Sequence, residues 1–145
     1  MSAWGDVAGV VRLPDGRSVR GTGARRARVP TDPVPDLAVY LFARQPRPAP
    51  WPSRWVRWRD LGLPHSTEDA VDALVEAHRR AATERVEIAC GGGVGRTGTA
   101  LAVLAVLGGV PAEDAVGWVR RHYHPRAVET RRQRAWVTEV APRLG

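Results

Sequence analysis

The chain has 145 residues, of which 43% are hydrophobic, and this length and apolar content are typical of one globular domain. All 22 of its basic residues are arginines, and against 15 acidic residues they give a net charge of +7, which attracts anionic partners. Cys90 is the only cysteine, and this excludes both an internal disulfide and a metal site built from several thiolates.

No run of about 18 or more consecutive apolar residues occurs, so a membrane-spanning helix is not expected. Residues 1–10 lack the basic start and the apolar core of a secretory signal. We therefore expect a cytoplasmic protein.

The first third of the chain predicts strands. A turn of sequence Pro-Asp-Gly at residues 14–16 separates short apolar-polar runs at residues 7–13 and 17–22, which indicates a β-hairpin. Residues 36–42 are continuously apolar after the first and predict a buried strand. Residues 45–52 contain four prolines and are expected to form a loop.

A strand followed by a helix is predicted next. Charged and aromatic residues alternate over residues 54–58, which indicates a strand that ends in a turn at residues 60–64. Ser66 and Thr67 then precede two acidic residues, and apolar residues recur at helical spacing after them. We expect a helix over residues 67–82.

The centre of the chain predicts a strand, a turn and a helix in direct succession. Residues 86–90 are expected to form a short strand, which leads through a glycine-rich turn at residues 91–95 into an apolar helix over residues 96–107. Glycines at positions 108 and 109 end that helix, and Pro111 begins the next one at its first turn.

The C-terminal segment predicts a final helix. Thr130 and Gln133 form a capping box at its start, and its apolar side is made of Trp136, Val137, Val140 and Leu144. Strands come early and helices dominate later, with one strand-turn-helix unit between them. This order predicts an α/β fold with a central mixed, largely parallel sheet flanked by helices and with an N-terminal β-hairpin.

Residues 90–98, of sequence Cys-Gly-Gly-Gly-Val-Gly-Arg-Thr-Gly, carry the chemistry of the chain. They place a thiol at the end of a predicted strand and an arginine six residues later at the start of a helix. Because glycine adopts positive φ freely, the backbone N–H groups between them can turn inward around one point. We predict an anion site there, closed by a bidentate contact from Arg96 and formed by the backbone of Gly91, Gly92, Gly93, Val94 and Gly95.

The same positive surroundings favour the thiolate form of Cys90 at neutral pH. A thiolate beneath a bound phosphate is placed for in-line attack on phosphorus. The hydroxyl of Thr97 is close enough in sequence to donate a hydrogen bond to the sulfur and ease its later departure. Cys90, Arg96 and Thr97 are therefore predicted to be catalytic.

Two other phosphate-binding loops explain the sequence less well. Residues 93–98 match the glycine pattern of a dinucleotide-binding loop, but no strand with an acidic end follows the helix. The loop of nucleotide-triphosphate-binding proteins requires glycine at position 90 and lysine at position 96. Neither alternative accounts for the cysteine.

The pattern of Cys90, five residues, Arg96 and Thr97 resembles the signature of the cysteine-dependent protein-tyrosine and dual-specificity phosphatases. Residues 58–64 are similar to the mobile acid loop of that family, and the resemblance implies that Asp60 is the general acid for the leaving oxygen.

A third segment, residues 128–133, is similar to the glutamine loop of the same family and implies that Gln133 positions the hydrolytic water. Three residues depart from the family pattern. Ala89 stands where histidine usually precedes the cysteine, Arg59 replaces the proline of the acid loop, and Glu129 replaces the first glutamine of the glutamine loop.

The resemblance spans about residues 54–137. With the chain length it leads us to expect one phosphatase-like domain over residues 1–145, with N-terminal strands and the proline-rich loop in residues 1–53 and a catalytic core in residues 54–145. It implies a protein-tyrosine phosphatase, with dual specificity open, that forms a cysteinyl-phosphate and uses no metal or cofactor. Phosphorylated proteins or peptides are the expected partners, with phosphate or another oxyanion in the site, and nucleic acid is not an expected partner.

Two alternatives stay open. The departures from the family pattern are also compatible with a catalytically weak phosphate-binding pseudophosphatase. The arginine content leaves room for a phosphatase of RNA or phosphoinositides.

Overall fold

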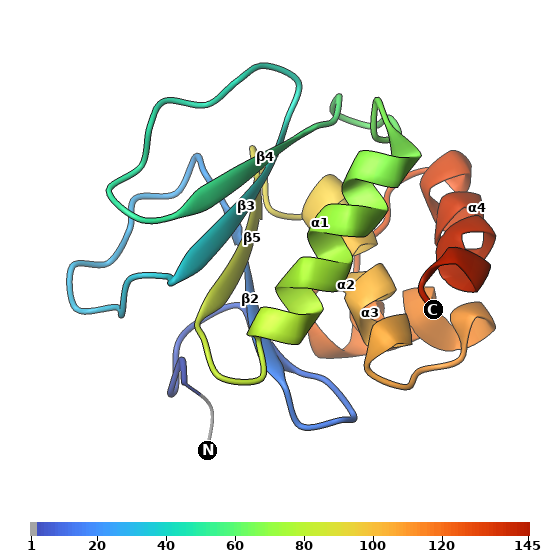
Figure 1. Ribbon diagram of the computed structural model, residues 1–145, viewed down its shortest axis with the longest axis horizontal. Helices are drawn as coiled ribbons and strands as arrows, with labels where there is room; N and C mark the ends of the chain where they lie inside the picture. Colours follow the sequence, from blue (N-terminus) through green and yellow to red (C-terminus); the bar gives the residue numbers. More distant parts are fainter. Residues whose placement is uncertain (1–2) are drawn as a thin grey trace.

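A five-stranded sheet forms the centre of the molecule (Figure 1). The computed structural model describes residues 3–145. The strand order is β1-β2-β5-β3-β4, and the strands are β1 Val10–Arg12, β2 Ser18–Gly23, β3 Leu37–Phe42, β4 Ser53–Arg57 and β5 Val86–Cys90. The β1-β2 pair is antiparallel, and the β2-β5, β5-β3 and β3-β4 pairs are parallel. The predicted mixed, largely parallel sheet is confirmed.

The β1-β2 hairpin turns at the predicted Pro-Asp-Gly segment. The backbone N–H of Leu13 donates to the carbonyl of Arg17 at 2.7 Å, and that of Gly16 donates to the carbonyl of Leu13 at 2.9 Å. Gly16 has a φ of 94°, a conformation that glycine adopts without the steric cost that a β-carbon brings. The turn chemistry therefore fixes the position of the hairpin in the sequence.

Four α-helices and two short 3₁₀ turns follow the strands, and they are α1 Thr67–Arg80, α2 Gly95–Leu107, η1 Ala112–Asp114, α3 Ala115–His122, α4 Arg131–Val140 and η2 Ala141–Arg143. The hydroxyl of Ser66 caps α1 by accepting from the N–H of Asp69 at 3.1 Å, as its sequence predicts. Helix α2 is buried along nearly its whole length because it packs against β5 and β2 and is surrounded by α1, α3 and α4. An apolar helix without a polar face suits that central place.

Three helix ends differ from the sequence-based prediction. Helix α1 ends at Arg80 and not at residue 82. The segment after Pro111 begins as the 3₁₀ turn η1 and becomes α-helical at Ala115. Helix α4 ends at Val140, so the predicted apolar position Leu144 lies beyond it. Pro142 explains the early end, because proline has no N–H to continue the helical hydrogen bonds.

The two faces of the sheet are covered differently. In Figure 1 the helices gather on one face, while two long loops, residues 24–36 and 43–52, extend on the other side. The core lies between the sheet and the helices, and its largest fully buried apolar side chains include Leu41, Ile88, Leu101, Leu104 and Trp136. Among the residues that the structure describes, no helix is long and apolar enough to cross a membrane.

Parallel pairing places the functional segments together. Because β2, β5, β3 and β4 run in the same direction, their carboxyl ends lie at one edge of the sheet. The chain leaves that edge at four points, which are residues 24–36 after β2, 43–52 after β3, 58–66 after β4 and 91–94 after β5. This edge is where ligands bind in open α/β sheets.

Candidate active site

Cys90 ends β5 at the carboxyl edge of the sheet, and only 2% of its surface is exposed. Its Sγ accepts a hydrogen bond from the backbone N–H of Gly93 at 3.1 Å. The loop of residues 91–94 therefore curls back over the sulfur before helix α2 begins at Gly95. Helix α2 has no acidic residue of its own in its first turn, although the carboxylate of Glu129 lies against Gly95 at the helix start.

Glycines in this loop allow the backbone to pack against the end of β2. Gly93 has a φ of 76°, and a β-carbon on it would lie 2.6 Å from the backbone nitrogen of Gly23. A β-carbon on Gly23 would in turn lie 2.7 Å from the carbonyl carbon of Gly92. Backbone meets backbone on both sides, so neither Gly93 nor Gly23 can carry a side chain without moving the loop.

Arg96 is 6% exposed, and one edge of its guanidinium group is anchored to protein carbonyls. Its Nη1 donates to the carbonyl of Leu41 at 3.0 Å and to that of Trp58 at 3.1 Å. Its buried Nε has no hydrogen-bond partner among the described residues, and its Nη2 lies 3.7 Å from the Asp60 carboxylate. The Nε and Nη2 edge can therefore take two oxygens of an oxyanion, which is the geometry that arginine offers to phosphate.

The acid loop, residues 58–64, is folded close to residues 91–94, which we call the phosphate loop. Trp58 is fully buried, and its Nε1 donates to the carbonyl of Gly62 at 2.7 Å, which closes the loop on itself. Its ring packs edge-on against Trp136 of α4, with the ring centres 5.4 Å apart. Asp60 lies at the tip with 65% of its side chain exposed, beside Arg96. A carboxyl group placed there can meet the outer oxygen of a phosphate ester held by Arg96.

Gln133 is fully buried and joins helix α4 to the acid loop. Its Oε1 accepts from the backbone N–H of Glu129 at 2.9 Å and from that of Thr130 at 3.3 Å, and the predicted capping box is confirmed. Its Nε2 donates to the carbonyl of Gly62 at 3.1 Å, the same oxygen that Trp58 uses. In this structure both ends of the amide are engaged by protein groups, so its predicted contact with a hydrolytic water stays a prediction.

Thr97 of the predicted site and Glu129, one of the departures from the family pattern, also take positions that the sequence did not specify. Thr97 Oγ1 lies 3.5 Å from the carbonyl oxygen of Thr22, at the limit for a hydrogen bond, and its predicted bond to the sulfur stays a prediction. The carboxylate of Glu129 lies against Gly95 and leaves no room for a β-carbon there. Glu129 therefore brings negative charge to the outer side of the phosphate loop.

Tyr123, which lies just after α3, contacts the phosphate loop and was not predicted from the sequence. Its hydroxyl donates to the carbonyl of Gly93, and its ring packs where a β-carbon on Gly21 would stand. Burial and the negative charge of Cys90 raise the pKa of Tyr123 to about 12. The glycines of β2 were the only signal, because glycine inside a strand indicates close approach of another group.

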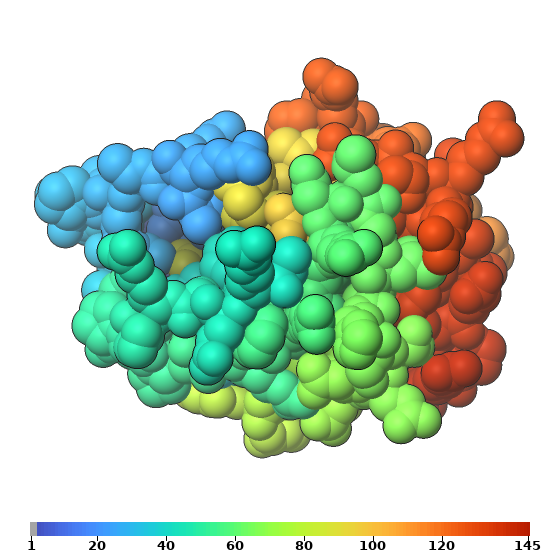
Figure 2. Space-filling view, turned by 90° about the horizontal axis from the view of Figure 1, so that it is seen from above, coloured from blue at the N-terminus to red at the C-terminus, as the bar shows by residue number. Residues whose placement is uncertain are grey.

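Figure 2 shows the chain around the phosphate loop, in yellow, between the blue segment that follows β2 and the green acid loop. Cys90 and Arg96 therefore meet Asp60, which comes from a separate part of the sequence. No group of three or more histidine, cysteine, aspartate or glutamate side chains arranged to hold a metal ion is found within residues 3–145.

Comparison with known proteins gives matches to phosphatases. The sequence model of a family described as "PTP-SAK: Swiss Army Knife protein, DSP-PTPase phosphatase domain" matches residues 47–142. The chain is 37% identical over 90 residues to the uncharacterized protein MJ0215 of Methanocaldococcus jannaschii, and this match covers 61% of the chain and 54% of that protein. It is 38% identical over 90 residues to the uncharacterized protein MJECL20 of the same organism, covering 58% of it. The chain thus spans about half the length of the curated relatives it matches.

Solved structures of tyrosine phosphatases share the fold. The active form of Tk-PTP superposes with a TM-score of 0.69 at 24% identity, covering 92% of this chain and 97% of that one. Kinase associated phosphatase gives a TM-score of 0.57 at 20% identity, covering 65% of this chain and 54% of that one. TcPTP1 of Trypanosoma cruzi gives 0.53 at 26% identity, covering 64% of this chain and 34% of that one. The first of these likenesses extends over nearly the whole of both chains.

Proposed function

This chain belongs to the DSP-PTPase phosphatase domain family, and on that premise we propose that it is a cysteine-dependent phosphatase that hydrolyses phosphomonoesters. The observation that carries the proposal is the position of Cys90 Sγ, which accepts the N–H of Gly93 within the turn that Arg96 closes. An oxyanion bound by that turn and by the free edge of Arg96 has the sulfur below it. We expect phosphotyrosine of proteins among the substrates, because the family takes its name from that activity.

The reaction has two steps. In the first, the Cys90 thiolate attacks phosphorus, the bond to the ester oxygen breaks, and Asp60 gives its proton to the leaving oxygen. In the second, water attacks the cysteinyl-phosphate, Asp60 takes the proton of that water, and the S–P bond breaks. Inorganic phosphate leaves and the thiolate returns. Arg96 and the loop amides hold the negative charge that grows on the phosphoryl oxygens.

The proposal predicts distinct effects for two variants assayed with aryl phosphates. Cys90→Ser removes the nucleophile, so hydrolysis should fall to background. Asp60→Asn removes the proton donor and should lower kcat by about 10²–10⁴-fold for phenyl phosphate, whose leaving group needs the proton. For 4-nitrophenyl phosphate, the rate of the ester-cleaving step should fall much less in the same variant, because that leaving group departs readily without a proton.

Thermal unfolding of each variant checks that the fold is kept. Undiminished hydrolysis by Cys90→Ser would rule out the mechanism. If the wild-type protein binds phosphate or vanadate but hydrolyses no aryl phosphate, the chain is a phosphate-binding module. The contacts that engage Gln133 and the exposure of Asp60 are the features that favour this second function.

A further inference from the structure

We propose that Arg25 forms a second anion subsite beside the phosphate loop, and that this site favours substrates that carry a second phosphoryl group close to the scissile one. Substrates of this class are diphosphates and vicinal bisphosphates. The inference rests on the proposed function and concerns the chemical class of the substrate.

The segment after β2 is hydrogen-bonded to the phosphate loop through its backbone. The N–H of Ala24 donates to the carbonyl of Cys90 at 2.7 Å, and the N–H of Arg25 donates to the carbonyl of Gly91 at 3.1 Å. These two bonds continue the β2-β5 pairing past the end of the strands and into the loop. Arg25 is therefore held beside the loop by its own backbone.

The side chain of Arg25 lies on the same side of Gly91 as that of Arg96. A β-carbon on Gly91 would stand 3.3 Å from Nη2 of Arg25 and 3.4 Å from Nη2 of Arg96. Two guanidinium groups thus approach one point at the start of the phosphate loop. Glycine at position 91 leaves that point free of protein atoms.

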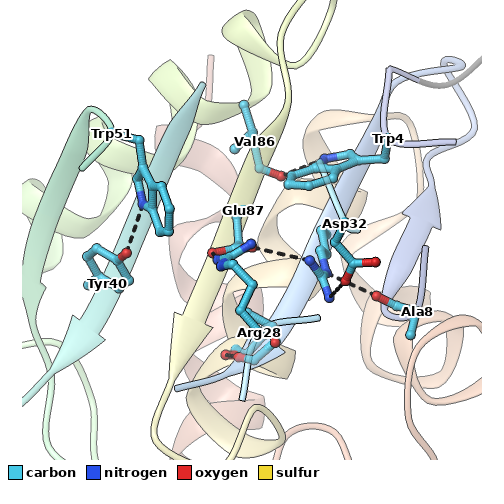
Figure 3. Close-up of polar contacts among 11 residues, drawn as sticks. Trp4, Ala8, Arg28, Asp32, Tyr40, Trp51, Val86 and Glu87 are labelled. Carbon is cyan, nitrogen blue, oxygen red and sulfur yellow. Dashed lines mark hydrogen bonds and ion pairs between the residues drawn. The ribbon is translucent and has the colours of Figure 1, made fainter. Parts of the chain in front are cut away.

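The residues after Arg25 in the loop 24–36 are held to the sheet by a buried carboxylate. Glu87 of β5 is 1% exposed and pairs with Nη2 of Arg28 at 2.7 Å, as Figure 3 shows. The guanidinium of Arg28 also lies over the ring of Trp51, 4.5 Å from its centre. A second ion pair, between Arg20 and Asp32 at 3.1 Å, holds the far end of the segment. Arg25 is carried by a loop that is tied to the sheet on both sides.

Arg25 lacks a counter-ion in the protein. No carboxylate of the described residues pairs with Arg25, whereas Arg20, Arg28 and Arg96 each have an acidic neighbour within 4 Å. Two arginines close together repel each other, and a bound anion with charge beyond that of one phosphate relieves the repulsion. Arg25 is therefore available to an anionic group other than the phosphate that Arg96 holds.

The short distance between Arg25 and Arg96 favours a second phosphoryl group as the ligand of Arg25 over an acidic residue of a peptide. In a phosphotyrosine peptide the aromatic ring separates the phosphate from every other anionic group. Arg25 is exposed, and its Nη2 approaches the same point as the arginine that holds the phosphate, which is the position of a group linked to that phosphate by a few bonds. A diphosphate or a vicinal bisphosphate places its second phosphoryl group at that range.

Pyrophosphate and orthophosphate test the subsite without any need for turnover. With the Cys90→Ser protein at constant ionic strength, calorimetry should show pyrophosphate binding at least about tenfold more tightly than orthophosphate, since a charge-assisted contact has that worth. Adding Arg25→Gln should remove this preference and change orthophosphate affinity less than about threefold. Arg12→Gln, which removes one exposed charge from β1 opposite the start of β2, is the control and should leave the preference intact.

Each outcome either supports or overturns the Arg25 subsite. Equal affinities in Cys90→Ser, or a preference that survives Arg25→Gln, would overturn the subsite. Loss of both affinities in Arg25→Gln with an unchanged thermal midpoint would also overturn it, because Arg25 would then serve the first phosphate. A pyrophosphate preference in a protein that hydrolyses nothing would keep the subsite and remove the proposed phosphatase activity.

Discussion

Tyr123 supports the phosphate loop from the side that faces away from the acid loop. It contacts Gly93 through its hydroxyl and Gly21 through its ring, and so it connects the loop to the end of α3. It does not touch the reacting atoms in the proposed mechanism, and we regard it as a positioning residue. The negative charge of Cys90 is one cause of its raised pKa, after burial, so the two residues are electrostatically coupled.

Titration of Tyr123 should report that coupling. Ultraviolet absorbance of the wild-type protein should show one tyrosine ionising near pH 12, and Tyr123→Phe should lack that step. In Cys90→Ser the pKa of Tyr123 should fall but stay above 10.0, because the thiolate charge is lost while burial remains. An unchanged titration in Cys90→Ser would contradict the coupling.

The same shift has a consequence for stability. The pKa of Tyr123 in the folded protein lies above its value of 10.0 in the unfolded chain, so the folded state holds the proton more tightly. The corresponding stabilisation is complete below pH 10 and is lost as pH rises through about 12. The free energy of unfolding should fall over this range, and by less in Tyr123→Phe.

At the scale of elements, the start of α4 and the acid loop form one unit. The amide of Gln133 completes the capping box with Thr130 and also donates to the carbonyl of Gly62. The indole of Trp58 donates to the same oxygen. The position of Asp60 therefore depends on a helix cap that is distant in sequence.

Two variants should separate the cap from the acid loop. Thr130→Ala should lower the free energy of unfolding by about 1 kcal/mol through loss of the cap, and it should leave kcat nearly unchanged. Gln133→Ala should cost a similar amount and should also lower kcat, because the bond to Gly62 is lost and Asp60 is less well placed. Equal kcat values in the two variants would show that Gln133 acts only as a cap.

The elements that could be predicted are those whose sequence contains a local physical cause. The Pro-Asp-Gly turn, the Ser66 cap and the Thr130 and Gln133 capping box each act within a few residues, and all are present. The predicted start of α3 was wrong, because a 3₁₀ turn precedes the α-helix. One proline indicates where a helical segment starts but not its type. The end of α4 was missed because Pro142 was not taken into account.

Long-range contacts could not be predicted in the same way. The sequence indicated Cys90 and Arg96 because the loop that joins them is short. Nothing in the sequence indicated that Arg25 reaches that loop, and only the glycines of β2 pointed to a close neighbour such as Tyr123, because both approaches depend on the β2-β5 pairing and on the packing of α3. For Asp60 only the resemblance to a known acid loop was informative, and the structure places it beside Arg96.

In the whole molecule, different sides of the sheet serve stability and binding. The helices bury one face and supply the apolar core, while Arg25 and Arg96 lie beside Gly91 at the carboxyl edge. The net charge of +7 should draw anionic substrates toward this edge, and more strongly at low salt. The fold is shared with tyrosine phosphatases, and the segment around Arg25 is where we expect this chain to select its own substrate.

In the proposed mechanism, Cys90 carries the phosphoryl group during turnover. In Asp60→Asn with 4-nitrophenyl phosphate, formation of the intermediate needs little acid, whereas its hydrolysis lacks the base, so the intermediate should accumulate. Rapid acid quenching followed by mass spectrometry should find the mass of one phosphoryl group on the peptide that contains Cys90. Turnover with that peptide unmodified, or with the phosphoryl group on another residue, would contradict the account.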